Sequence, residues 1–155
     1  MAARCSDSHG ARIVAAAREW IGTPYCHQAS CKGAGTDCLG LIRGVWRDTI
    51  GPEPVSIGAY PADWAEATGS EVLQDGIGAH FRTVPSDAAQ PGDVLLFRML
   101  KQGPARHLAI LAEGHPADPH ARMIHVVSGH STCEAPLSVS WWRRLTSVGR
   151  YPTPQ

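Results

Sequence analysis

One segment constrains the fold more than any other, and it runs over residues 36–46 as Thr-Asp-Cys-Leu-Gly-Leu-Ile-Arg-Gly-Val-Trp. Its apolar residues recur at intervals of three and four, which is the spacing of one buried face of an amphipathic helix. These residues are Cys38, Leu41, Ile42, Val45 and Trp46. Asp37 or Thr36 is well placed to cap the first turn. A cysteine therefore stands where a helix begins, and unpaired N–H groups with the positive end of the dipole favour its thiolate there.

Around this segment the chain places helices first and strands afterwards. A helix is predicted over residues 12–21, where Gly22 ends it, and a loop over residues 25–35. After a Pro- and Gly-rich connector at 51–61, short helices are expected near residues 63–64 and 71–73. Strands are predicted at 94–97, 107–111, 123–127 and 147–151. This order predicts an α+β fold with helices packed on one side of a mainly antiparallel sheet.

Length and charge bound the possible classes of protein. With 155 residues, one domain is expected at 12–151, between a flexible N-terminus at 1–11 and a tail at 152–155. The formal net charge is zero, so the chain has no excess of basic residues of the kind that nucleic-acid-binding proteins show. No apolar run reaches the length of a membrane span. The N-terminus does not resemble a signal peptide, because the apolar residues 13–17 run directly into Arg18 and Glu19.

Two histidines can supply a base for the cysteine. Alternation along a strand puts His107 with Ala109 and Leu111 on one face, and His125 on the face opposite Ile124. If the two strands are neighbours, both histidines point the same way. A helix N-terminus packed against that face would bring Cys38 to them. Cysteine, histidine and histidine would then act as nucleophile, base and orienting group.

A metal site is the competing interpretation of the cysteines. The chain has five cysteines, and an odd count without a signal peptide argues against a disulfide framework. Cys26, His27 and Cys31 resemble one half of a zinc site, with Cys38 as the obvious third ligand. No second pair of ligands follows at suitable spacing, so we expect no metal and no cofactor. Three further histidines, His115, His120 and His130, are expected to be solvated in loops.

Several short motifs, taken in order, resemble the NlpC/P60 family of cysteine peptidases, and more narrowly its members from phage tails and gene-transfer-agent particles. The matching stretches are Gly22-Thr23-Pro24-Tyr25, residues 36–41 and 90–95, His107-Leu108-Ala109-Ile110-Leu111, Ile124-His125 and Trp141-Trp142-Arg143-Arg144. The resemblance implies a papain-like core with Cys38 as nucleophile, His107 as general base and acid, and His125 as the orienting third member. It also implies that Tyr25 donates to the oxyanion. The chain departs from the common family pattern at Leu39, where serine is usual, and at Leu108-Ala109-Ile110, where Val-Gly-Ile is usual.

The implied activity is hydrolysis of an amide bond in peptidoglycan stem peptides, with γ-D-glutamyl-diaminopimelate as the expected bond, through an acyl-enzyme on Cys38. The implied partner is a hub protein of a phage-like tail or baseplate. The enzyme would then be made in the cytoplasm, ride on the particle and act in the periplasm of the target cell, without inserting into a membrane or binding nucleic acid. Two alternatives stay open: a non-catalytic tail-tip protein, and a thiol amidase or acyltransferase on the same fold. Residues 141–144 are either a platform for sugar or peptide, or an edge that packs one tryptophan while the arginines stay in water.

Overall fold

A six-stranded sheet forms the centre of the computed structural model, which describes residues 8–54 and 72–154. The strand order is β3-β8-β4-β5-β6-β7, and every neighbouring pair is antiparallel. The strands are β3 (Arg82–Val84), β4 (Val94–Arg98), β5 (Ala105–Glu113), β6 (Arg122–His125), β7 (Cys133–Pro136) and β8 (Leu145–Arg150). A separate two-stranded sheet pairs β1 (Ser30–Cys31) with β2 (Gly35–Thr36). The helices are α1 (His9–Arg18), α2 (Cys38–Thr49), α4 (Val72–His80) and α5 (Val139–Trp142), with a 3-10 turn at Ser86–Ala88.

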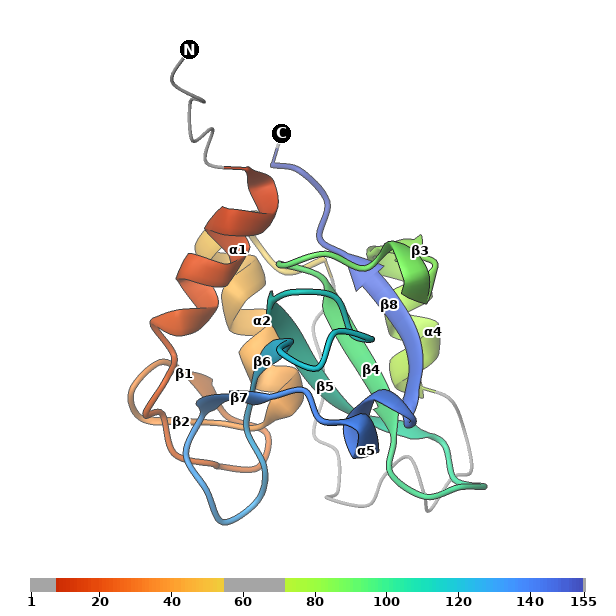
Figure 1. Cartoon of the computed structure of the whole chain (residues 1–155). Helices are drawn as coiled ribbons and strands as arrows, with labels where there is room; N and C mark the ends of the chain where they lie inside the picture. The colour runs from red at the N-terminus through yellow and green to blue at the C-terminus, as the bar shows by residue number, and fades with distance from the viewer. Residues whose placement is uncertain (1–7, 55–71, 155) are drawn as a thin grey trace.

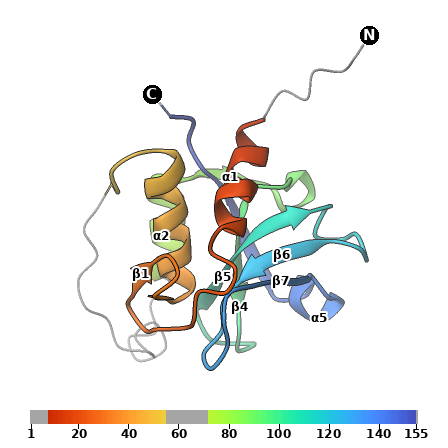
Figure 2. The ribbon, with the colours of Figure 1, turned by 90° about the vertical axis from the view of Figure 1, so that its left-hand side faces the viewer.

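The three longer helices cover one face of the sheet, as Figures 1 and 2 show. Leu41 and Val45 of α2 pack there in the same buried cluster as Leu108 and Ile110 of β5. The opposite face carries a second buried cluster, covered by connecting segments and by α5. Its members from the sheet are Val84, Leu95, Phe97, Ala109, Leu111, Met123 and Val148. The predicted α+β architecture, with helices on one side of an antiparallel sheet, is confirmed.

Helix α2 can lie close to its neighbours because two of its residues have no side chain. A Cβ at Gly40 would collide with the carbonyl of Ala29, and one at Gly44 would collide with the ring of Trp20. Trp20 is itself 1% exposed, so its ring has no room to move aside. The two glycines therefore set how closely α2 packs on the Ala29 backbone and on the Trp20 ring.

Two buried polar contacts join the end of the chain to the rest of the fold. The Asp93 carboxylate, 1% exposed, accepts from Nε and Nη2 of Arg150 at 2.8 Å each, a bidentate pair. The Tyr151 hydroxyl donates to the carbonyl of Ile42 in α2 at 2.8 Å. No helix within the described ranges is long and apolar enough to cross a membrane.

The structure corrects several predicted boundaries. Helix α1 begins at His9, because the Ser8 hydroxyl caps it by accepting from the N–H of Ala11 at 3.1 Å. Residues 9–11 are thus helical and do not belong to a flexible N-terminus. The predicted loop at 25–35 contains β1 and the first residue of β2, and four further elements were not predicted: β3, the 3-10 turn at Ser86–Ala88, β7 and α5. The helix expected near 71–73 is α4, whereas residues 63–64 lie outside the described part.

Candidate active site

Cys38 is the first residue of α2, and Asp37 caps that helix. The Asp37 carboxylate, 4% exposed, accepts from the N–H of Gly40 at 2.7 Å and from the N–H of Gln28 at 2.8 Å. The Cys38 sulfur lies 3.9 Å from the carbonyl oxygen of Arg106, and the backbone N–H of Leu108 also reaches it. The sulfur therefore contacts the backbone of β5 at residues 106 and 108, which flank His107.

Burial decides the protonation state of this thiol. It raises the pKa of Cys38 to about 11, although the backbone N–H groups of Leu108, Leu39 and Cys38 itself act to lower it. The prediction that the helix start favours a thiolate is wrong for the resting protein. The donors act in the predicted direction, but removal from water outweighs them.

His107 and His125 form a buried couple. Nε2 of His107 lies 3.0 Å from Nδ1 of His125, and the two residues are 7% and 6% exposed. Burial, with the neighbouring charges of His125 and Arg106, lowers the pKa of His107 to about 3. Burial also lowers the pKa of His125. Both imidazoles are neutral at pH 7, and Nδ1 of His107 is the ring nitrogen that does not face His125.

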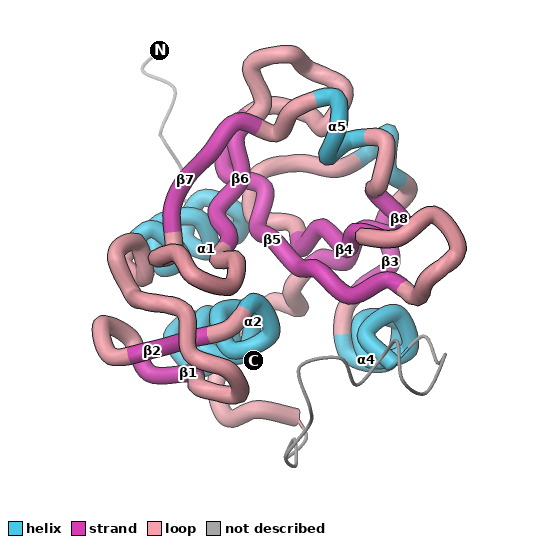
Figure 3. Tube along the Cα trace, turned by 90° about the horizontal axis from the view of Figure 1, so that it is seen from below, coloured by secondary structure: helices cyan, strands magenta, loops and turns pink. Residues whose placement is uncertain are grey.

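Helix α2 does not pack on the face of the sheet that carries the two histidines, which was the expected arrangement. Both histidines lie on the face of the second cluster, where the His107 ring is 6.1 Å from that of Phe97. Helix α2 packs on the other face, against Leu108 and Ile110. Cys38 nevertheless comes to residue 107, because the first turn of α2 and the start of β5 lie at the same end of the molecule (Figure 3).

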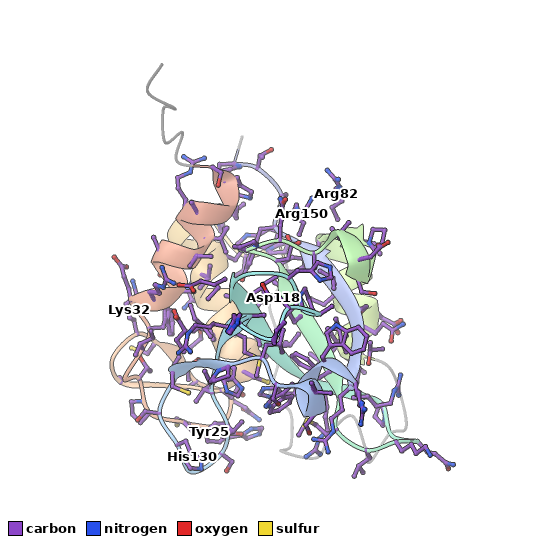
Figure 4. All side chains as sticks on the ribbon, in the orientation of Figure 1. Tyr25, Lys32, Arg82, Asp118, His130 and Arg150 are labelled. Atoms are coloured by element: carbon purple, nitrogen blue, oxygen red, sulfur yellow. The ribbon has the colours of Figure 1, made fainter. Side chains whose placement is uncertain are left out.

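Tyr25 stands beside the cysteine in a segment with a fixed backbone. Its N–H donates to the carbonyl of His130 at 3.0 Å, and it forms a parallel bridge with Thr36. Figure 4 shows Tyr25 and His130 together at the lower end of the molecule. Burial, followed by the negative charges of Asp37 and of a Cys38 thiolate, raises the pKa of Tyr25. Its hydroxyl is therefore a protonated donor near the sulfur.

Trp141 is part of the site, although the sequence did not predict that it would lie next to His107 and His125. Its ring stacks on His107, with ring centroids 5.0 Å apart and an interplanar angle of 30°. It also meets His125 edge-on at 5.5 Å. The Trp-Trp pair in the sequence was the available signal, but α5 has four residues and shows no helical periodicity. Trp141 shields the couple from water and fixes the plane of the base.

The residues of the metal interpretation are arranged differently. Cys26 and Cys31 are exposed, and Nδ1 of His27 lies 3.8 Å from the Asp37 carboxylate. Within residues 8–54 and 72–154, no group of three or more His, Cys, Asp or Glu side chains could hold a metal ion. Of the loop histidines, His115 bonds the carbonyl of Asp87 at 3.0 Å, and none belongs to the couple.

Comparison with known proteins identifies the fold. Among solved structures, the chain is similar to the NlpC/p60 domain of the peptidoglycan hydrolase SagA, with a TM-score of 0.59 and 26% identity over 90% of this chain and 97% of that one. It is similar in fold to an NlpC/P60 family protein from Bacillus cereus, with a TM-score of 0.62 and 18% identity over 92% of this chain and 40% of that one. It also shares its fold with the peptidoglycan hydrolase RipB from Mycobacterium tuberculosis, with a TM-score of 0.53 and 18% identity over 92% and 64% of the two chains.

By sequence alone, no curated protein matches the chain. The model of the NlpC/P60 family matches residues 22–150, a range that includes the cysteine, both buried histidines and the tryptophan that stacks on them. The chain belongs to the NlpC/P60 family.

Proposed function

We propose that this chain is a thiol peptidase that hydrolyses an amide bond in the stem peptides of peptidoglycan. One observation carries the proposal: the Cys38 sulfur sits against residues 106–108, and His107 is joined to His125 at 3.0 Å. A thiol hydrolase needs its nucleophile close to a base that a third group orients. The similar domain of SagA, of which 97% is covered, belongs to a peptidoglycan hydrolase.

The protonation states define the first step. Cys38 is a thiol and His107 is a neutral imidazole, so the proton passes from Sγ to Nδ1 as the sulfur attacks the carbonyl carbon. His125 then accepts from the Nε2–H of His107 and stabilises the imidazolium. Because His107 is held at Nε2, its Nδ1 is the nitrogen that faces the reaction.

The remaining steps use the same groups. The oxyanion receives hydrogen bonds from the backbone N–H of Cys38 and from the Tyr25 hydroxyl. His107 returns its proton to the leaving amine, and an acyl-enzyme is left on Cys38. His107 next removes a proton from water, which attacks the thioester and frees the carboxylic acid, and His107 then returns that proton to the Cys38 sulfur. A base of this kind contributes about 100- to 10,000-fold to the rate.

Digestion of purified sacculi tests the function. We expect wild-type protein to release soluble fragments whose masses show a cut between D-glutamate and diaminopimelate. Transfer of the acyl group to an added amine would instead identify an acyltransferase. Intact sacculi after prolonged incubation, with no release of stem-peptide fragments, would contradict the proposal and favour a structural role.

We further propose that the enzyme belongs to the phage-type members and reaches the wall on a tail or baseplate. Residues 141–144, Trp-Trp-Arg-Arg, support the subclass. The formal net charge of zero offers no general attraction to a polyanionic wall, so a docking partner would supply location. Mass spectrometry of purified particles tests this. Detection only in the cytoplasm of producing cells would exclude delivery and leave the chemistry untouched.

A further inference from the structure

A pocket of about 440 Å³ opens beside the candidate active site, between two connections of the sheet. One wall is the turn from β4 to β5, residues 98–101, and the other is the segment that joins α5 to β8, residues 143–146. Their backbones are tied together, because the N–H of Arg98 donates to the carbonyl of Arg144 at 2.9 Å. The two walls are thus held in a fixed relation.

The lining of the pocket is strongly cationic. Among the residues that the structure describes, the lining contains the four basic side chains of Arg98, Lys101, Arg143 and Arg144 and no acidic side chain. Arg98 is oriented by a bond from its guanidinium to the carbonyl of Gly103. Lys101, Arg143 and Arg144 repel each other around one small volume, and an anion bound among them relieves that repulsion.

These cations differ from most other arginines of the protein in their partners. Within the described residues, Lys101, Arg143 and Arg144 form no ion pair with a carboxylate, and all three are exposed. Five arginines elsewhere do form such pairs: Arg18, Arg43, Arg47, Arg122 and Arg150. The pocket therefore offers donors that no carboxylate of the described chain occupies.

The pocket adjoins the catalytic groups. Trp141 stacks on His107, and Arg143 and Arg144 follow it by two and three residues. Figure 1 shows α5 and the β4–β5 connection toward the lower end of the molecule, where α2 begins. Trp142 and Leu100, 43% and 56% exposed, add apolar surface beside the cations. Each wall of the pocket follows a residue whose ring lies near His107: Phe97, at 6.1 Å, directly precedes Arg98, and Trp141, at 5.0 Å, precedes the segment of Arg143 and Arg144.

We propose that this pocket binds a free carboxylate of the stem peptide and so selects acidic substrates. The inference rests on the proposed function, because it takes the anion from the same substrate. Guanidinium groups match a carboxylate with two parallel hydrogen bonds, which suits the two adjacent arginines. Binding in the pocket fixes which end of the substrate lies beyond Trp141. Amidation of the bound carboxylate removes the preference for acidic substrates.

Binding to the Cys38→Ala protein tests the site without turnover. We expect the tripeptide L-alanyl-γ-D-glutamyl-diaminopimelate to bind about tenfold more tightly than its fully amidated form in isothermal titration. In Arg143→Gln/Arg144→Gln on the same background this preference disappears. A matched control, Arg12→Gln/Arg82→Gln, removes two exposed arginines elsewhere and retains it. Equal binding of both peptides by the parent protein, or an unchanged preference in the pocket variant, overturns the proposal.

A second measurement separates failure of the pocket from failure of the proposed function. Arginine Nε–H resonances are followed by NMR during titration with N-acetyl-D-glutamate and, separately, with inorganic phosphate. Saturable shifts of Arg143 and Arg144 with N-acetyl-D-glutamate support a carboxylate site even if sacculi are not cut. Shifts with phosphate alone, or with neither probe, overturn it even if sacculi are cut.

Discussion

Acid should weaken this fold through one buried histidine, and the size of the effect follows from its pKa. The ordinary pKa of 6.5 falls to about 3 for His107 in the folded protein. Below pH 6.5 His107 binds a proton in the unfolded chain but not in the folded chain. Stability that is present above pH 6.5 is therefore lost as the pH falls toward 3. At pH 5 the expected loss from this group is about 2 kcal/mol, since each pH unit below the unfolded pKa costs about 1.4 kcal/mol.

Urea denaturation at pH 7.5 and pH 5.0 measures the difference. His107→Gln keeps a polar group against His125 but does not titrate, so its free energy of unfolding should fall about 2 kcal/mol less than that of the wild type over this interval. His120→Gln replaces an exposed histidine and should behave as the wild type does. If wild type and His107→Gln lose the same stability between the two pH values, the burial argument for the base is refuted.

Two further predictions concern the scaffold. Gly44→Ala places a methyl group against the ring of Trp20 and should destabilise the protein by about 1–3 kcal/mol. Gly76→Ala, in open space on α4, should instead stabilise the protein by up to about 1 kcal/mol. Thermal denaturation compares the two variants, and equal effects on stability would contradict the packing of Gly44 on Trp20. Asp93→Asn leaves Arg150 without its carboxylate and should cost about 3 kcal/mol in urea denaturation; a loss within error of zero would show that the pair contributes nothing.

Much of the site was predictable because it lies on strongly periodic segments. The stripe from Leu41 to Trp46 fixed a helix start at Cys38, and alternation along β5 and β6 put His107 and His125 on one face. The pairing of β5 with β6 then brought the rings together. The spacing of apolar residues carried these predictions, and the pairing of β5 with β6 was the condition that it left open.

The parts that were missed depend on tertiary contacts. Helix α5 has one turn, so Trp141 showed no periodic signal and is placed by its contact with His107. Strand β7 pairs with β6 although its Cys-Glu-Ala-Pro sequence has no alternation. The thiolate prediction failed because desolvation depends on how deeply the sulfur is buried, and a helix start alone does not fix that depth.

The central claim is that Cys38 attacks the substrate and that His107 takes its proton. The most direct measurement is the rate at which purified variants release amine from a soluble stem peptide, with circular dichroism to show that each is folded. We predict no release above background for Cys38→Ala, a loss of about 100-fold or more for His107→Gln, and the wild-type rate for Cys31→Ala, which removes an exposed thiol. A folded Cys38→Ala protein that cleaves at the wild-type rate would contradict the account.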